Sequence, residues 1–266
     1  MASVTAPRPR WPAILLLILL ASCTAPASAA TLHVAPSGAA AASCATAAAP
    51  CTLARALGLA AAADVVSLAA GGYDKDSCGL SVTAPDISLE GPSFSGGADA
   101  GPAAAATIDC EGTHRFLEVR GGGATAPVGI SISHLIVTNT HYNGTVHASV
   151  GGVRGGAFNF VDAGSAAAPI VLRNVHVRDA QVTGGGWSTT GACLNVQNSH
   201  VDVAQSSFTD CVNTDGRLSG AIYIQVRRRR RRRRPSGGRP RRTRADAHPF
   251  VVSAHRRAAP RRGSSR

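Results

Sequence analysis

Three segments in the second half of the chain share one pattern of apolar and polar residues. They are residues 130–139 (ISISHLIVTN), 170–179 (IVLRNVHVRD) and 201–210 (VDVAQSSFTD). Apolar residues occupy positions 1, 3 and 8 of all three segments and position 6 of two, and Asn or Asp occupies position 10. Alternation with a period of two predicts strands with one buried face. Repetition of such strands, with Gly-rich stretches between them, predicts an all-β solenoid.

A second repeated element alternates with the first. It reads GAFNF at residues 156–160, GACLNV at 191–196 and GAIYI at 220–224. The middle copy carries its apolar pair one residue later than the others, which we interpret as a bulge or an insertion. The closing residues Asn139, Asp179 and Asp210 are predicted to stack at a corner. There a short polar side chain bonds the backbone of a turn.

The first half of the chain predicts one helix among short strands. Thr52 is the expected N-cap of a helix that begins at Leu53 and ends before Asp64, and such a helix would cover the open first turn of the solenoid. Strands are expected at residues 31–34, 65–68, 87–89, 107–109 and 116–119. Two-residue hairpin turns are mostly absent, which favours parallel over antiparallel pairing.

Residues 1–30 have the features of a secretory signal peptide. Arg8 and Arg10 precede an apolar run from Trp11 to Ala21, and the small residues of 27–29 (ASA) suit a signal peptidase. The run is short for a membrane anchor. As an alternative, residues 20–23 (LASC) resemble a bacterial lipobox, which would attach a lipid anchor at Cys23.

Cysteine usage agrees with export. The chain has seven cysteines, and without Cys23 six remain, an even number that predicts disulfides in a secreted protein. The candidates are Cys44, Cys51, Cys78, Cys110, Cys193 and Cys211. Cys44 with Cys51 is the favoured pair, and Cys193 could bridge Cys211, but free buried thiols remain an alternative. No cysteine–histidine spacing supports zinc.

The formal net charge of +12 comes from the chain's ends. Residues 227–266 hold 17 of the 27 basic residues and one acid, including eight consecutive arginines from Arg227 to Arg234. Residues 31–226 hold 8 basic and 14 acidic residues, a net charge of −6.

We expect residues 226–266 to be a disordered tail. Because the repeat breaks off after Ile224, we interpret the tail as the product of a shifted reading frame. Binding of nucleic acid, anionic lipid or acidic polysaccharide by the tail is the alternative.

The repeats resemble a known architecture. Residues 32–38, 50–53, 64–68 and 72–73 resemble the opening turn of right-handed parallel β-helices of the pectin-lyase-like superfamily. The GGAF of 155–158 and the FTDC of 208–211 resemble the GGAI and FxxN repeats of chlamydial polymorphic outer-membrane proteins. The resemblance covers residues 31–225 by pattern. It implies a right-handed parallel β-helix at the cell surface, in a family associated with adhesion and carbohydrate contact.

Candidate catalytic and metal-binding residues are acids in the repeats. Asp179 and Asp210, with Asp202 nearby, could hold Ca²⁺ if they lie on adjacent strands, with Arg178 and Arg217 as basic neighbours. We favour a structural role, because Asp179 and Asp210 occupy corner positions. Asp215 lies in an NTDG sequence similar to the first catalytic motif of polygalacturonases. The later motifs of that family are missing, so we interpret the sequence as a turn.

Few other residues predict chemistry. Asn143 begins an Asn-Gly-Thr glycosylation sequon. His134, His176 and His200 are expected on strands and turns and not as metal ligands. Tyr142 and Trp187 are too few for a sugar-stacking platform.

The sequence therefore predicts a secreted or cell-surface β-helix module without catalytic activity, for adhesion or carbohydrate contact. The alternative is a truncated polysaccharide-degrading enzyme with Asp215 in its active site, and a third class is a binder of nucleic acid or membrane through its basic tail. We expect a polysaccharide or cell-surface ligand and no nucleic-acid partner. Membrane attachment is expected only through the signal or Cys23.

Overall fold

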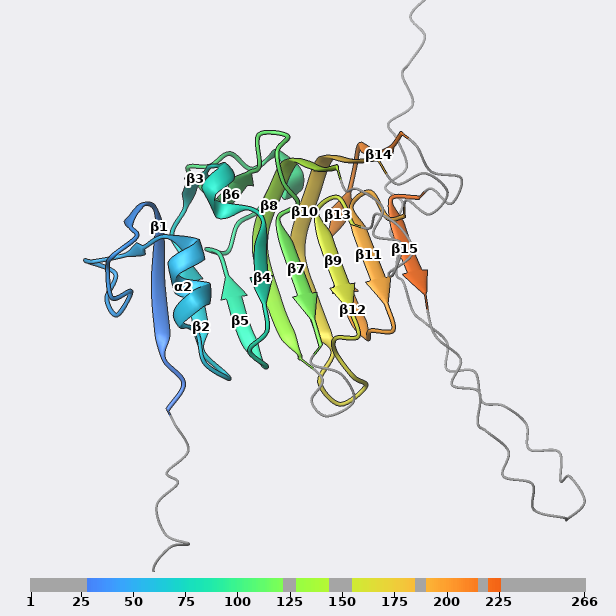
Figure 1. Cartoon of the computed structure of the whole chain (residues 1–266). Helices are drawn as coiled ribbons and strands as arrows, with labels where there is room; N and C mark the ends of the chain where they lie inside the picture. Colours follow the sequence, from blue (N-terminus) through green and yellow to red (C-terminus); the bar gives the residue numbers. More distant parts are fainter. Residues whose placement is uncertain (1–27, 122–127, 144–154, 185–189, 215–219, 226–266) are drawn as a thin grey trace, which may run out of the picture.

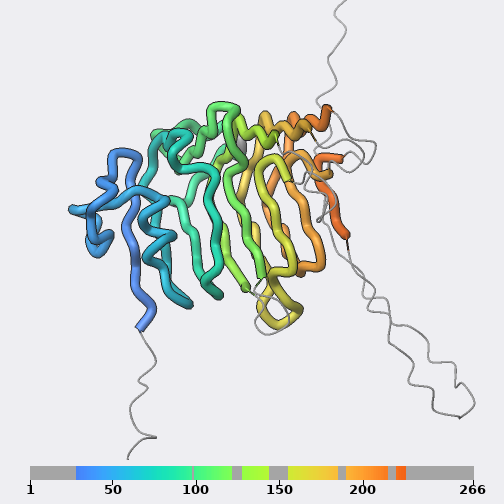
Figure 2. The backbone as a smooth tube through the Cα atoms, viewed as in Figure 1, coloured from blue at the N-terminus to red at the C-terminus, as the bar shows by residue number. Residues whose placement is uncertain are grey.

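The described part of the chain consists mainly of β-strands, which pair in parallel to form its sheets. The computed structural model describes residues 28–121, 128–143, 155–184, 190–214 and 220–225. Its strands form a ten-stranded and a five-stranded sheet, and the chain passes repeatedly from one sheet to the other (Figures 1 and 2). Most of the predicted signal peptide with Cys23, the predicted tail and Asp215 lie outside the described residues.

The larger sheet has the order β1-β2-β5-β8-β10-β12, with four short strands beside this path. Its main strands are β1 (Thr31–Ala39), β2 (Val65–Leu68), β5 (Ile87–Glu90), β8 (Ile130–Asn143), β10 (Ile170–Thr183) and β12 (Val201–Ala204). The short ones are β3 (Gly71–Tyr73), β6 (Ala106–Asp109), β13 (Ser207–Phe208) and β14 (Cys211–Asn213).

The smaller sheet has the order β15-β11-β9-β7-β4. Its strands are β4 (Leu80–Val82), β7 (Leu117–Arg120), β9 (Phe158–Val161), β11 (Leu194–Gln197) and β15 (Ile222–Gln225). Figure 1 shows β7, β9 and β11 lying in front of the larger sheet. Buried side chains of both sheets belong to one hydrophobic core, in which Phe116 packs edge-on against Phe158 with ring centroids 5.6 Å apart.

The three aligned segments of the sequence stack in the predicted register. Ile130 pairs with Ile170, and Ile170 pairs with Val201, all in parallel. The apolar positions of β8 and β10 are almost fully buried, which confirms the predicted core face. The period-two pattern fixes this register, because a slip of one residue would turn the apolar side chains outward.

Left-handed backbone at two positions bends each long strand. Within the three aligned segments, the positive-φ residues are His134, Asn139, Asn174, Asp179, Gln205 and Asp210. They stand at positions 5 and 10 of the three aligned segments, which confirms the corner predicted at position 10. Because of the bends, successive parts of β8 and β10 pair with separate short strands, such as β5 and β6 on one side and β12, β13 and β14 on the other.

The hydrogen bonds at these corners differ from the expectation. Asn139 Nδ2 donates to both carboxylate oxygens of Asp109 at 3.0 Å, and Thr138 Oγ1 donates to Asp179 Oδ2 at 3.4 Å. Asp109 Oδ1 also accepts from the Glu111 N–H of its own turn at 2.9 Å, but the bonds of the Asn139 and Asp179 side chains join neighbouring strands. The reason is that paired strands lie only about 4.8 Å apart.

The bulge expected in the middle copy of the second repeat is wrong. Gly191 is equivalent to Gly155 and not to Gly156, because Leu194 pairs with Phe158 and both glycines have left-handed backbone with φ of 62° and 69°. A Cβ atom on Gly191 would meet the carbonyl oxygen of Leu194 at 2.4 Å. When the two left-handed glycines are aligned, the apolar residues of both copies coincide, so the middle copy contains no extra residue.

A short helix covers one end of the sheets. Helix α2 (Leu53–Leu59) begins as predicted at Leu53, with Thr52 as its N-cap; the Thr52 side chain accepts a hydrogen bond from the Arg55 N–H at 3.3 Å. Leu53 and Ala56 are buried, and the helix contacts β1, β2 and β4 (Figure 1). Two 3₁₀ helices, η1 (Lys75–Ser77) and η2 (Gly97–Asp99), lie in the connections.

Candidate binding groove

An open groove of about 680 Å³ crosses the larger sheet where the long strands bend for the second time. It is formed by β8, β10, β14 and the turn after β6, which lie together along the upper side of the molecule in Figure 1. The lining residues are Glu111, Gly112, Asn139, Thr140, His141, Asp179, Ala180, Gln181, Asp210 and Val212.

Stacked side chains form the floor of the groove. His141 pairs with Gln181, and Gln181 pairs with Val212 on the next strand. Thr140 and Ala180 point into the interior, where each is 1% exposed. Because side chains alternate along a strand, the residues that follow them, His141 and Gln181, face solvent. Beside this column, the bends bring Asn139, Asp179 and Asp210 to the surface.

Two hydrogen bonds hold the His141 ring in place. Nδ1 lies 3.2 Å from the Gly112 carbonyl oxygen, and Nε2 lies 2.9 Å from Thr183 Oγ1. Because a carbonyl oxygen can only accept, we assign a proton to Nδ1, which leaves Nε2 to accept from the Thr183 hydroxyl. The imidazole is therefore a fixed part of the groove floor.

The groove carries negative charge. Glu111, Asp179 and Asp210 are exposed carboxylates, and among the described residues no lysine or arginine belongs to the lining. Lys75 Nζ lies 3.5 Å from Glu111 Oε2, but both side chains are about half exposed, so this pair contributes little stability. The field of the groove therefore disfavours anionic ligands and permits neutral or cationic ones.

The structure brings together the two acids for which a calcium site was considered. Asp179 of β10 and Asp210, which directly precedes β14, line the same groove. Asp202 is exposed on β12 outside the groove, and Arg178 lies on β10 beside Asp179. In the part of the chain that the structure describes, no three His, Cys, Asp or Glu residues gather closely enough to hold a metal ion. The sequence did not single out Glu111, His141 or Gln181, because only the register of the strands places them here.

Other predicted site residues have separate locations. Asn143 is exposed at the end of β8, whereas Gly144 and Thr145 of its sequon lie outside the described residues, as do Trp187 and Arg217. His134 stands at a bend of β8, His176 is buried on β10, and His200 is exposed before β12.

All six candidate cysteines form disulfides. The bridges are Cys44–Cys51, Cys78–Cys110 and Cys193–Cys211. The first and third are pairings considered from the sequence. The third ties β14 of the larger sheet to the residue before β11 of the smaller one. Within the described ranges, no helix has the length and hydropathy to cross a membrane.

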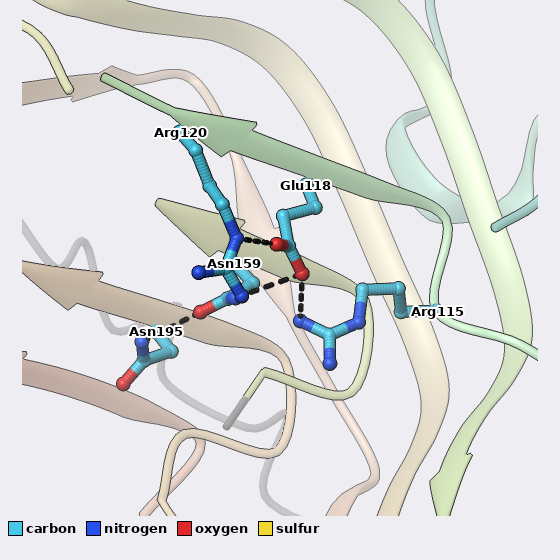
Figure 3. A network of polar contacts seen from close by, with 5 residues as sticks. All are labelled: Arg115, Glu118, Arg120, Asn159 and Asn195. Atoms are coloured by element: carbon cyan, nitrogen blue, oxygen red, sulfur yellow. Dashed lines mark hydrogen bonds and ion pairs between the residues drawn. The ribbon is translucent and has the colours of Figure 1, made fainter. Parts of the chain in front are cut away.

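A polar network runs across the outer side of the smaller sheet (Figure 3). Glu118, Asn159 and Asn195 occupy equivalent positions on β7, β9 and β11. Asn159 Nδ2 donates to Glu118 Oε2 at 3.1 Å, and Asn195 Nδ2 donates to Asn159 Oδ1 at 2.8 Å. Thr190 Oγ1 completes the chain by donating to Asn195 Oδ1 at 3.1 Å.

Two arginines bracket Glu118. Arg115 Nη1 lies 2.9 Å from Glu118 Oε2, and Arg120 donates from Nε to Oε1. Burial raises the pKa of Glu118, but the hydrogen bond from Arg120 and the charge of Arg115 outweigh it and hold the pKa below its usual value. Arg115 also stacks on Tyr142, its guanidinium carbon 3.5 Å from the ring centroid. Every charge of this network has a partner, which indicates a structural element and not a reactive site.

Comparisons with known proteins found no match. No family model, no curated protein and no solved structure is similar to the chain.

Proposed function

We propose that residues 31–225 form a right-handed parallel β-helix. The proposal is supported by the parallel register of equivalent strands, by bends at equivalent positions and by the passage of the chain from one sheet to the other after each turn. Right-handedness is expected because parallel strands joined by a crossover are right-handed in nearly all proteins. Scattering data that fit a compact sphere better than an elongated body would contradict it.

We propose that the protein is secreted or held at the cell surface. Three disulfides support this location, since such bonds persist mainly in oxidising compartments. The predicted signal peptide of residues 1–30 points the same way. Expression as a fusion with a periplasmic reporter checks the signal, because reporter activity should disappear when residues 1–30 are deleted.

Within this architecture, we propose that the groove binds a neutral, linear polysaccharide without cleaving it, as an adhesive or carbohydrate-contacting module. The observation that carries the proposal is the groove itself, in which the corner residues Asn139, Asp179 and Asp210 repeat beside the His141 and Gln181 side chains. Equivalent groups therefore recur about every 4.8 Å along the groove. Amide and carboxylate groups at a regular interval suit a polymer that presents hydroxyl groups at a regular interval.

Affinity electrophoresis tests the proposal. The full chain should be retarded in gels that contain a neutral glucan, galactan or mannan, and not in gels that contain polygalacturonate. Gln181→Ala should weaken binding about fivefold, the equivalent of one hydrogen bond of about 1 kcal/mol.

A matched pair of charge changes locates the site. Asp210→Asn and Asp202→Asn each remove one exposed carboxylate, but only Asp210 lines the groove. We expect Asp210→Asn to change the affinity and Asp202→Asn to leave it unchanged. Equal effects, or release of new reducing ends from the polysaccharide, would overturn the proposal, and the second result would favour the degrading-enzyme alternative.

A further inference from the structure

A serine and a histidine are coupled away from the groove, where β10 pairs with β13. His176 and Ser207 are paired across these strands, and Ser207 Oγ lies 2.7 Å from His176 Nδ1. The second ring nitrogen, Nε2, lies 3.0 Å from Oδ1 of Asn174, two residues earlier on β10. Val175 and Val177 point into the core, so the histidine between them points outward. The three side chains therefore stand in the order of nucleophile, base and orienting group.

The surrounding bonds fix where the protons lie. Asn174 Nδ2 is 3.4 Å from the carbonyl oxygen of Phe94, which can only accept, so the amide must present Oδ1 to His176. His176 Nε2 therefore carries the proton, and Nδ1 offers a lone pair to the Ser207 hydroxyl. His134 Nδ1, 3.1 Å from Asn174 Nδ2, accepts from the same amide. This assignment gives His176 the tautomer that a general base requires.

The environment suits a neutral base beside a partly accessible hydroxyl. His176 is 6% exposed, with the Phe94 ring centroid 5.8 Å from its own, and burial lowers its pKa. Ser207 is only half-buried on β13, and within the described residues this strand pairs with β10 alone. The base is thus shielded from water, whereas the hydroxyl can be reached from the open side of the strand.

The same strand supplies a candidate donor for a developing negative charge. The Thr209 N–H donates to the Val177 carbonyl at 2.9 Å, so it faces β10. Successive N–H groups of a strand face opposite sides, and the Phe208 N–H therefore faces away from β10. The N–H of the residue after the nucleophile is a common oxyanion donor in acyl transfer.

We propose that Ser207, His176 and Asn174 form a serine-type site that hydrolyses acyl esters. Ser207 Oγ bonds to the carbonyl carbon while its proton passes to His176 Nδ1. The ester C–O bond then breaks, and the departing alcohol takes that proton. Next, His176 deprotonates a water molecule that attacks the acyl carbon, and the carboxylic acid leaves as Ser207 regains its proton. This activity is independent of the groove and of its ligand.

Labelling of the full chain with a fluorophosphonate tests the proposal. We expect an adduct on Ser207, located by peptide mass mapping, and a labelling rate at least about 100-fold lower in His176→Gln. Ser206→Ala is the matched control, because the Ser206 hydroxyl bonds backbone atoms, the Ala204 carbonyl at 2.9 Å and the Val175 N–H at 3.1 Å. Absence of an adduct on Ser207 in the wild-type chain, or equal rates in wild type and His176→Gln, would overturn the proposal.

Asn174 is tested as a positioning residue. Glycine tolerates the φ of 52° at this position, so Asn174→Gly removes the amide without straining the backbone, whereas Asn174→Asp keeps an oxygen facing Nε2. We expect Asn174→Gly to slow labelling at least about tenfold. Asn174→Asp should restore the rate and move the midpoint of its pH profile upward, because a carboxylate favours the imidazolium. If the pH profile is the same in all three proteins, Asn174 does not orient the base.

Discussion

Asn195 donates a hydrogen bond from Nδ2 to Oδ1 of Asn159 at 2.8 Å, across two strands in which the two residues are directly paired. Asn195 is 0% exposed and Asn159 is 4% exposed. These amides lie on the outer side of the smaller sheet, yet they are as buried as core residues. Their hydrogen bonds must therefore be made within the protein, since water cannot replace them.

The first prediction concerns this pair. Asn195→Ala leaves the Asn159 carbonyl oxygen buried without its donor, which should lower the free energy of unfolding by about 1–3 kcal/mol. Ser81 of β4 pairs with Glu118 and is the exposed end of the same row of side chains across the smaller sheet. Ser81→Ala should therefore alter stability by less than about 0.5 kcal/mol. Urea denaturation followed by circular dichroism measures both. Equal losses for the two variants would mean that the amide ladder contributes no special stability.

The second prediction concerns Glu118. Glu118→Gln removes the charge that faces Arg115, whose side chain is only 9% exposed, and should cost about 2 kcal/mol or more at pH 7. Because the folded pKa of Glu118 lies below its usual value of 4.5, its contribution is complete above that pH. The contribution is lost as the pH falls through the folded pKa. The gap between wild type and variant in urea midpoint should therefore narrow between about pH 5 and pH 3, and a constant gap would contradict this role of the charge.

The third prediction uses the buried His176. Burial lowers its folded pKa below the usual 6.5, so the unfolded chain binds a proton first as the pH falls. Stability should therefore decrease below pH 6.5 until the folded pKa is reached. His176→Gln should reduce this decrease, whereas the exposed His200→Gln should not. Thermal denaturation between about pH 7.5 and 5.5 distinguishes the two variants.

The fourth prediction compares two glycines. Gly191→Ala places a Cβ atom 2.4 Å from the Leu194 carbonyl oxygen at a φ of 62°, so we expect a loss of about 1–3 kcal/mol. Nothing lies within 4 Å of the Cβ position of Gly58, in helix α2. Gly58→Ala should therefore stabilise the protein by about 0.5–1 kcal/mol through helix propensity. A lower melting temperature for Gly191→Ala and a higher one for Gly58→Ala would confirm both predictions.

The fifth prediction concerns the bridge between the sheets. Replacing both Cys193 and Cys211 by alanine removes a link with a sequence separation of 18 and should cost about 3 kcal/mol. The same change at Cys44 and Cys51, with a separation of 7, should cost less, about 2 kcal/mol. Guanidinium denaturation of the oxidised proteins gives the two values. A larger loss for the shorter loop would show that strain or packing, and not loop entropy, decides the order.

The core strands of the three aligned segments and their register follow from the order of the amino acids alone. Ile130, Ile170 and Val201 can be aligned by pattern, because a strand with an apolar side chain at every second position has one face to bury. Thr52 as a helix cap follows from local chemistry in the same way, since its hydroxyl bonds an N–H only three residues away.

Which polar side chains meet is a property of the folded chain. Glu111, His141 and Gln181 line one groove, although Glu111 and Gln181 are 70 positions apart in the sequence. Asn174, His176 and Ser207 share a hydrogen-bond network, although Asn174 and Ser207 are 33 positions apart. The sequence also predicts the wrong alignment for Gly191, because the left-handed bend that makes it equivalent to Gly155 leaves no trace in the pattern of apolar residues. Such contacts depend on the register between strands, and a shift of one residue would place each of these side chains on the opposite face.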